Sequence, residues 1–270
     1  MSIFITGANG QLGRLVINRL LSKMPPEHII AGVRRLESGQ PYAEQGISVR
    51  LCDYDQPASL EPAFAGVSKL LFISSSHHDD TVRLRQHAHV IEAAKKSKVA
   101  HMLYTSFAFP EQGSGPPIPL HLATEHAIRA AGIPFTFLRN ALYTDFVGAL
   151  DLHEAITKGT LRIAPGDWKF NSVTRQDLAD ASAAVLSESG HHNRIYELTA
   201  PTPWTFEDLA AALSSHAAQT VSLYPDPEVR HWIYGFLSKI DTSSTSDDLE
   251  RLLGRPAASL AQSIAPLIPV

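Results

Sequence analysis

The chain has 270 residues, enough for one large domain or for a domain with a smaller lobe. Its formal net charge is -4 and it has no run of Lys or Arg, which argues against DNA or RNA as a partner. The single cysteine, Cys52, excludes an intramolecular disulfide and a multi-cysteine metal site. No signal peptide precedes the first predicted strand and no apolar run reaches membrane-spanning length, so we expect a cytoplasmic protein without membrane contact.

The first predicted element is a short strand that leads directly into a glycine-rich turn and a helix. Residues 3–5 are apolar, Gly7, Gly10 and Gly13 follow, and apolar residues then repeat at helical spacing. Glycine lets the backbone approach a ligand closely, and a helix N-terminus presents N–H groups to an anion. We therefore predict that this turn binds the pyrophosphate of a dinucleotide, with a purely structural turn as the alternative.

The second predicted strand, residues 28–33, ends at two arginines. In dinucleotide sites this position meets the adenosine ribose, where an acidic residue bonds the 2′-hydroxyl of NAD. Arg34 would instead pair with a 2′-phosphate, because a guanidinium forms bidentate hydrogen bonds with that group. The position favours NADP(H), and a solvated turn at Arg34 and Arg35 is the alternative.

Polar residues follow the next two predicted strands, 47–52 and 69–73. Asp53 comes after the first of them and either bonds the adenine amino group or caps the following helix. The polar run 74–80 comes after the second, and loops at the carboxyl ends of parallel strands hold ligands in open α/β sheets. We expect no metal site in this run, because its histidines and aspartates are adjacent rather than spaced as metal ligands.

Two further strands are predicted at residues 100–105 and 134–138, with a helix between them. In that helix His121 is a candidate proton donor, with a capping or solvated histidine as the alternative. Glu125 is a candidate for orienting a ribose or an amide by hydrogen bonding. Strands separated mostly by helices predict an α/β fold with a doubly wound, parallel, Rossmann-type sheet.

The pattern changes beyond residue 140. A helix is predicted over 141–158, short strands over 159–173, and then two helices with a short strand at 195–199 between them. We therefore predict an NADP(H)-binding domain at residues 1–140 and a smaller mixed substrate lobe at residues 141–270, with the two interleaved. The lobe is expected to close over the ligand edge of the sheet.

The chemistry of ordinary short-chain dehydrogenases has no support in this sequence. They use a tyrosine with a lysine four residues later, and none of the seven tyrosines has a lysine at that position. A G-x-S-x-G elbow and a Walker motif are also missing from the sequence, so acyl and phosphoryl transfer have no support either. Quinones and delocalised carbocations need little beyond hydride, so positioning is the main catalytic effect for such acceptors.

Three segments, TGANGQLG, KLLFISSSHHD and HLATEHAIRAAGIPFTFLRNALYTDF, resemble the NmrA-like atypical short-chain dehydrogenase/reductases. Within that family the chain is similar to the triphenylmethane reductase and NADPH quinone oxidoreductase 2 branch, from the first strand to about Pro256. The resemblance implies NADP(H) binding, a substrate cleft between the two domains, and reduction of quinones or cationic triarylmethane dyes. Residues 221–246 form a shorter region than these reductases lead us to expect, which puts the choice of substrate in doubt.

Position and resemblance together assign the candidate site residues. The cofactor residues are Gly7, Asn9, Gly10, Gln11, Leu12, Gly13, Arg34, Asp53, Ser74, Ser75, Ser76, Thr105, Glu125, Arg139 and Asn140. The substrate residues are His77, Tyr104, Phe107, Tyr143 and Phe146. The predicted partner is a small aromatic or quinone acceptor. The family also includes redox sensors that bind NADP(H) without turnover, which is our second hypothesis. A homodimer is compatible with the sequence, which does not determine the oligomeric state.

Overall fold

The computed structural model describes residues 1–268, and their contacts divide the chain into two compact units. Unit 1 comprises Met1–Phe107, Pro117–Arg139 and Leu178–Tyr196. Unit 2 comprises Ala108–Pro116, Asn140–Asp177 and the chain from Glu197 onward. The cofactor and substrate roles that we assigned to residues 1–140 and 141–270 stay predictions.

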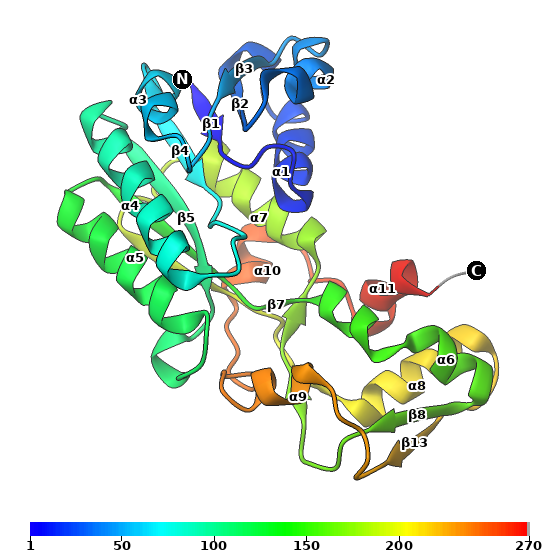
Figure 1. Cartoon of the computed structure of the whole chain (residues 1–270). Helices are drawn as coiled ribbons and strands as arrows, with labels where there is room; N and C mark the ends of the chain where they lie inside the picture. The colour runs from blue at the N-terminus through cyan, green and yellow to red at the C-terminus, as the bar shows by residue number, and fades with distance from the viewer. Residues whose placement is uncertain (269–270) are drawn as a thin grey trace. The chain divides into compact units, whose positions relative to one another are not determined.

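A seven-stranded sheet with the order β11-β6-β5-β4-β1-β2-β3 forms the centre of unit 1 (Figure 1). Its pairs β1–β2, β1–β4, β2–β3 and β4–β5 are parallel. The doubly wound parallel fold predicted from the sequence is therefore confirmed. The strands are β1 (Ile3–Ile5), β2 (Ile29–Val33), β3 (Ser48–Leu51), β4 (Lys69–Phe72), β5 (His101–Phe107), β6 (Phe135–Asn140) and β11 (Arg194–Leu198).

Helices cover both faces of this sheet, which is why its strands are nearly continuous apolar runs. On one face lie α3 (Leu60–Phe64), α4 (Asp80–Lys96) and α5 (Ile118–Ala131), and on the other lie α1 (Gln11–Leu21) and α7 (Arg175–Ser187) (Figure 1). The core under α3, α4 and α5 is aromatic, with Phe4, Phe72 and Phe137 fully buried. On the opposite face an ion pair between Arg19 and Asp180, at 2.5 Å, joins α1 to α7.

The direction of strand addition reverses at β1. Strands β2 and β3 follow on one side of β1, and β4, β5 and β6 follow on the other. At such a switch point the connections on either side leave a crevice at the carboxyl ends of the strands, where ligands bind in open α/β sheets. The glycine turn directly follows β1, so the fold places it at this crevice.

One strand lies elsewhere than the sequence predicted. We expected a short strand at residues 195–199 in the smaller lobe, whereas β11 pairs with β6 at the end of the central sheet. Without β11, the N–H and C=O groups along this side of β6 would be an open sheet edge. The backbone groups of β6 that would otherwise stay unpaired explain the position of this segment. Its own short apolar pattern is compatible with either sheet.

Unit 2 is assembled from short elements. Its two-stranded sheets pair β7 (Leu142–Tyr143) with β10 (Ser172–Val173), β9 (Lys169–Phe170) with β12 (Trp204–Thr205), and β8 (Thr160–Ile163) with β13 (Ser222–Pro225). Its helices are α6 (Leu152–Lys158), α8 (Phe206–Ala217), α9 (Trp232–Leu237), α10 (Asp248–Leu253) and α11 (Leu260–Ile264). Within residues 1–268, no helix combines the length and the apolar composition needed to cross a bilayer.

The single helix predicted over residues 141–158 is wrong. This stretch contains β7, then a 3₁₀ helix at Thr144–Leu150, and only then α6. Asp151 has a φ of +53°, which a right-handed helix does not allow, and its carboxylate accepts a hydrogen bond from the N–H of Glu154. The apolar periodicity continues across this interruption, which explains why the pattern resembles one continuous helix.

Three histidines of unit 1 are buried and neutral. Burial lowers the pKa of His87, His101 and His121 to about 3, and Arg83 adds to the effect at His87 and His121. His101 Nε2 lies 2.8 Å from Thr136 Oγ1, whose hydroxyl donates to the carbonyl oxygen of His191 at 2.6 Å. Because Thr136 uses its proton in that bond, His101 must donate from Nε2 and carries its proton there.

These histidines predict a loss of stability in weak acid. Between pH 6.5 and about pH 3 the unfolded chain protonates each of them while the folded chain does not, so the free energy of unfolding falls as the pH falls. Each histidine adds a slope of up to about 1.4 kcal/mol per pH unit, and adds nothing above that range. Chemical unfolding between pH 5 and pH 7.5 should show a smaller slope for His101→Gln. The exposed His153→Gln should keep the wild-type slope, and equal slopes for all three proteins would contradict this account.

A second prediction concerns the close packing of the glycine turn. A Cβ atom at Gly13 would lie 2.4 Å from the carbonyl oxygen of Gly7 and 3.0 Å from Ala8 Cα, so the backbone would have to shift. We expect Gly13→Ala to lower the free energy of unfolding by roughly 1–3 kcal/mol, measured by urea denaturation. Gly148→Ala is the control, because a Cβ added at Gly148 would meet nothing within 4 Å, and it should change stability little. No difference between the two variants would refute the packing argument.

Candidate functional site

The glycine turn is followed by backbone N–H donors in the first turn of α1. Gly7 has a φ of +57°, and the N–H of Gly10 donates to the Gly7 carbonyl at 2.8 Å, which closes the turn. Gly10 is the N-cap of α1 and no side chain caps the helix; the N–H of Arg14 donates to the Gly10 carbonyl at 3.0 Å. The N–H groups of Gln11, Leu12 and Gly13 precede that first helical bond and have no acceptor within the helix. Such a group of donors suits a pyrophosphate.

The loop after β2 is tied to the glycine turn. Asn9 Nδ2 donates to Ser38 Oγ at 2.8 Å and to the Ser38 carbonyl at 3.2 Å. Arg34 directly follows β2, is exposed, and forms no side-chain hydrogen bond or ion pair with another residue of 1–268. Its guanidinium is therefore available to a phosphate, while the Asn9 amide is engaged in holding the loop.

Asp53 lies at the end of β3 and is engaged in a local turn. Its Oδ1 accepts from the N–H of Asp55 at 3.1 Å, and its Oδ2 accepts from Gln56 Nε2 at 2.8 Å. These bonds stabilise the turn before the 3₁₀ helix Pro57–Ser59, but Asp53 does not cap that helix, whose N-cap is Gln56 without a side-chain cap. Contact between Asp53 and adenine stays a prediction.

The loop after β4 is held by hydrogen bonds to the neighbouring elements. The N–H of Ser74 donates to Thr105 Oγ1 of β5 at 2.9 Å, and the N–H of Ser75 donates to His87 Nε2 of α4 at 2.9 Å. Ser75 Oγ also donates to Gln86 Oε1 at 2.5 Å. Ser76 and His77 follow these anchored residues and are exposed. Ser74, Ser75 and Thr105 therefore shape this edge of the sheet.

Glu125 and Arg139 form a buried ion pair with each other. Arg139 Nε donates to Glu125 Oε1 at 2.9 Å, and a second guanidinium nitrogen donates to Oε2 at 2.7 Å. Ser106 Oγ adds a 2.7 Å hydrogen bond to Oε1. Glu125 is 0% exposed and Arg139 5%. The cofactor role that we predicted for these two side chains has no support from this placement, because the Glu125 oxygens already accept protein donors.

Tyr104 and His121 also face the interior rather than solvent. Tyr104 is fully buried, and its hydroxyl oxygen lies 2.8 Å from His121 Nδ1. The Phe107 ring stacks on His121 with ring centroids 6.3 Å apart. Because His121 stays neutral near pH 7, it does not hold the imidazolium proton that a general acid would release. The placement supports neither proton donation by His121 nor substrate contact by Tyr104.

The remaining predicted residues belong to unit 2. Asn140 Nδ2 lies 3.5 Å from the Tyr143 hydroxyl, and the guanidinium carbon of Arg175 lies 4.4 Å from the Tyr143 ring centroid. Phe146 contacts two aromatic rings of α9, Trp232 and Phe236. The sequence analysis did not single out these two residues, although their spacing of four in a short apolar segment was a readable signal.

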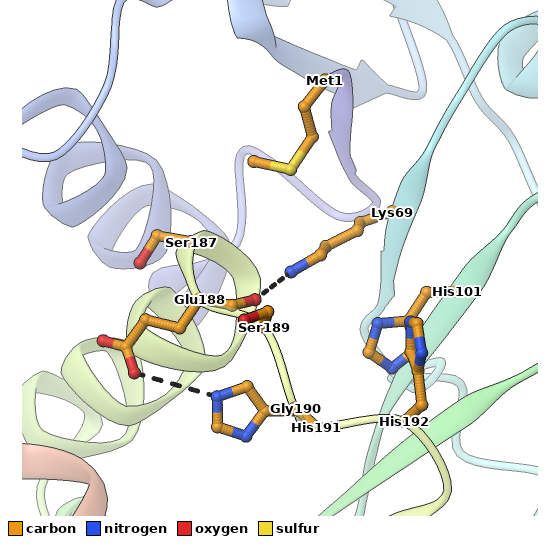
Figure 2. A pocket seen from close by; sticks show the side chains of 9 residues that line it. All are labelled: Met1, Lys69, His101, Ser187, Glu188, Ser189, Gly190, His191 and His192. Carbon is orange, nitrogen blue, oxygen red and sulfur yellow. Dashed lines mark hydrogen bonds and ion pairs between the residues drawn. The ribbon is translucent and has the colours of Figure 1, made fainter.

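A pocket at the opposite edge of the sheet was also missed by the sequence analysis (Figure 2). It lies at the amino ends of β4 and β5, where Lys69 and His101 begin these strands. Lys69 Nζ donates to the carbonyl oxygens of Val185, Leu186 and Glu188 at 3.2, 2.8 and 2.6 Å. The ammonium thereby neutralises the negative end of the α7 dipole and holds α7 on the sheet. No group of three His, Cys, Asp or Glu side chains within residues 1–268 is arranged to hold a metal.

The structure thus brings one part of the predicted set together in unit 1. Four predicted features lie at the carboxyl ends of strands that are neighbours in the sheet. They are the glycine turn after β1, Arg34 after β2, Ser74 after β4 and Thr105 near the end of β5. This grouping lies where ligands bind in open parallel sheets, and its role as a dinucleotide site stays a prediction.

Known proteins are similar to this chain in sequence and fold. A family model described as NAD(P)H-binding matches residues 7–189. Quinone oxidoreductase 2 of Escherichia coli K12 is 36% identical over 286 aligned positions, 99% of each chain. The triphenylmethane reductase of Citrobacter sp., solved in complex with NADP(H), is 44% identical with a TM-score of 0.92, over 99% of this chain and all of that one. An NmrA-like family domain-containing oxidoreductase of Aspergillus flavus is 31% identical, over 84% of this chain and 76% of its own length.

The glycine turn, the sheet that presents it and these full-length matches agree, and the resemblance inferred from the sequence is confirmed. The chain belongs to the NAD(P)H-binding, NmrA-like oxidoreductases.

Proposed function

We propose that this chain is an NADPH-dependent reductase that transfers hydride to a quinone or to a cationic triarylmethane-type acceptor. The observation that carries the proposal is its similarity, over 99% of both lengths, to the Escherichia coli quinone oxidoreductase 2. The similarity to the Citrobacter triphenylmethane reductase has the same extent and supports the second acceptor class. We also propose that the protein acts in the cytoplasm, since its single cysteine suits a reducing compartment.

The residues of unit 1 fit the phosphate groups of NADPH. The N–H groups from Gln11 to Gly13 would hold the pyrophosphate at the positive end of the α1 dipole. Arg34 would hold the 2′-phosphate, because its guanidinium is exposed and uncommitted among residues 1–268. Ser74 and Thr105, already bonded to each other, would border the nicotinamide half. When bound, NADPH supplies the hydride.

The acid–base character of the site restricts the acceptor. The candidate proton donor His121 is buried, and so is Tyr104, whose hydroxyl oxygen lies 2.8 Å from His121 Nδ1. Burial raises the pKa of Tyr104 and lowers that of His121, so near pH 7 His121 has no imidazolium proton to release and Tyr104 keeps its phenol proton in the interior, away from solvent. A ketone would need a proton from such a group during reduction. A quinone can take its protons from water and a carbocation needs only hydride, so these acceptors match the residues present.

NADPH oxidation with a panel of acceptors tests this proposal. We expect turnover with menadione, with malachite green or with both, and none with simple aliphatic ketones. The assay follows the loss of NADPH absorbance and, for the dye, the loss of its colour. Binding of NADPH without turnover of any quinone or dye would overturn the reductase assignment and leave the non-catalytic sensor.

A second experiment tests the assigned phosphate contact. Arg34→Ala should weaken NADPH binding about 10- to 100-fold, because charge-assisted hydrogen bonds are worth roughly 1.5–3 kcal/mol. NADH lacks the 2′-phosphate, so its dissociation constant should change by less than about threefold. Arg35→Ala is the matched control: Arg35 is the neighbouring exposed arginine and should matter little for either nucleotide. Equal losses for NADPH and NADH in Arg34→Ala would exclude this contact.

A further inference from the structure

Unit 2 presents three contacting aromatic rings that are partly open to solvent. We call Phe146, Trp232 and Phe236 the aromatic cluster. The centroid of the Phe146 ring lies 5.9 Å from that of Trp232 and 6.2 Å from that of Phe236, and Trp232 and Phe236 are 6.2 Å apart. The Phe146 and Phe236 rings are stacked, with an angle of 23° between their planes. The three rings therefore support one another in a fixed arrangement.

Trp232 differs from the other tryptophans of the chain. Its side chain is 56% exposed, whereas Trp204 is 7% exposed. The indole N–H groups of Trp168 and Trp204 donate to Ala164 and Ser172. The indole N–H of Trp232 has no acceptor within residues 1–268. Trp232 therefore offers both a ring face and a hydrogen-bond donor to a ligand.

The folding of α9 explains why these rings are exposed. This helix buries Ile233, Tyr234 and Leu237 in the core of unit 2. Trp232 and Phe236 are four residues apart, so they share the face of α9 that these core residues do not occupy. Phe146 packs against that face and extends it. Burial in the core of unit 2 thus accounts for one face of α9, and the other face has no such explanation.

We propose that the aromatic cluster binds the flat conjugated ring system of the acceptor. This inference rests on the proposed function and names the side chains that recognise its substrate. Offset or edge contacts between aromatic rings are favourable, and a tryptophan face attracts a delocalised cation as well. The cluster therefore contacts both acceptor classes, and it favours the cationic triarylmethane over the neutral quinone.

The chain around the cluster agrees with this assignment. Phe146 lies in the segment that leaves β6, which also contains Asn140 and Tyr143, two of the residues assigned by resemblance to the nicotinamide and substrate sides. Trp232 and Phe236 lie in the region 221–246, which is shorter than the family resemblance led us to expect. The aromatic cluster shows that this shortened region still supplies ring faces suited to an aromatic acceptor.

Dye binding without NADPH tests the inference, because no turnover then takes place. Malachite green is titrated into the protein and its absorbance and fluorescence are followed, since both change when its rings are immobilised. We expect Trp232→Ala to raise the dissociation constant about tenfold, in line with aromatic and cation–π contacts. Trp232→Phe should retain part of the affinity. Tyr224→Ala is the matched control, because Tyr224 is 55% exposed, lies in the same unit and contacts no ring of the cluster.

Steady-state kinetics separate a binding role from loss of the fold. In Trp232→Ala and Phe236→Ala the KM for malachite green should rise about tenfold, that for menadione should rise less, and the KM for NADPH should stay at the wild-type value. Unchanged dye affinity and unchanged acceptor KM in both variants, with the NADPH KM intact, would overturn the inference and leave the reductase proposal standing. Trp232-dependent dye binding by a protein that turns over no acceptor would support the inference while the proposed function fails.

Discussion

The buried pair of Glu125 and Arg139 is the constraint on which the ligand edge of unit 1 depends. The pair joins α5 to Arg139, near the carboxyl end of β6. The hydrogen bond from Ser106 also connects the end of β5 to this pair. Leaving either charge alone in the interior costs roughly 3–5 kcal/mol, so the three elements must remain together. The pair therefore fixes where β6 leaves the sheet and where the chain enters unit 2.

The same interior keeps the side chains of Tyr104 and His121 away from solvent. Phe72, Tyr104 and His87 pack against one another beneath α4 and α5, and the Tyr104 hydroxyl lies 2.8 Å from His121 Nδ1. A polar side chain in such surroundings stays neutral, since charge is costly to bury. The groups at the carboxyl ends of the strands of the central sheet include a set of backbone donors and the exposed guanidinium of Arg34. These groups suit the binding and orientation of a nucleotide, which agrees with the proposed reaction, in which position and hydride are sufficient.

The two units contribute different kinds of recognition. Unit 1 supplies backbone N–H groups and Arg34, which suit phosphate oxygens. Unit 2 supplies Tyr143, Phe146 and the rings of α9, which suit an aromatic ligand. In the proposed function charge recognises the nucleotide and ring faces recognise the acceptor, so the two kinds of contact rest on different physical interactions and can be altered separately.

The sequence by itself determined the sheet, the glycine turn and the cofactor class. These features are local: apolar runs, glycines and the arginine directly after β2 follow one another along a short part of the chain, and their spacing is enough to interpret them. Only the tertiary structure showed where the side chains of Glu125, Arg139 and Tyr104 lie. The sequence assigned them to ligands, whereas in the fold they are buried and form hydrogen bonds within the protein. It also placed β11 in the central sheet and brought Phe146 to Trp232. In each case the partner lies in another helix or strand, and hydrogen bonding or burial between separate elements leaves no periodic signal in either of them.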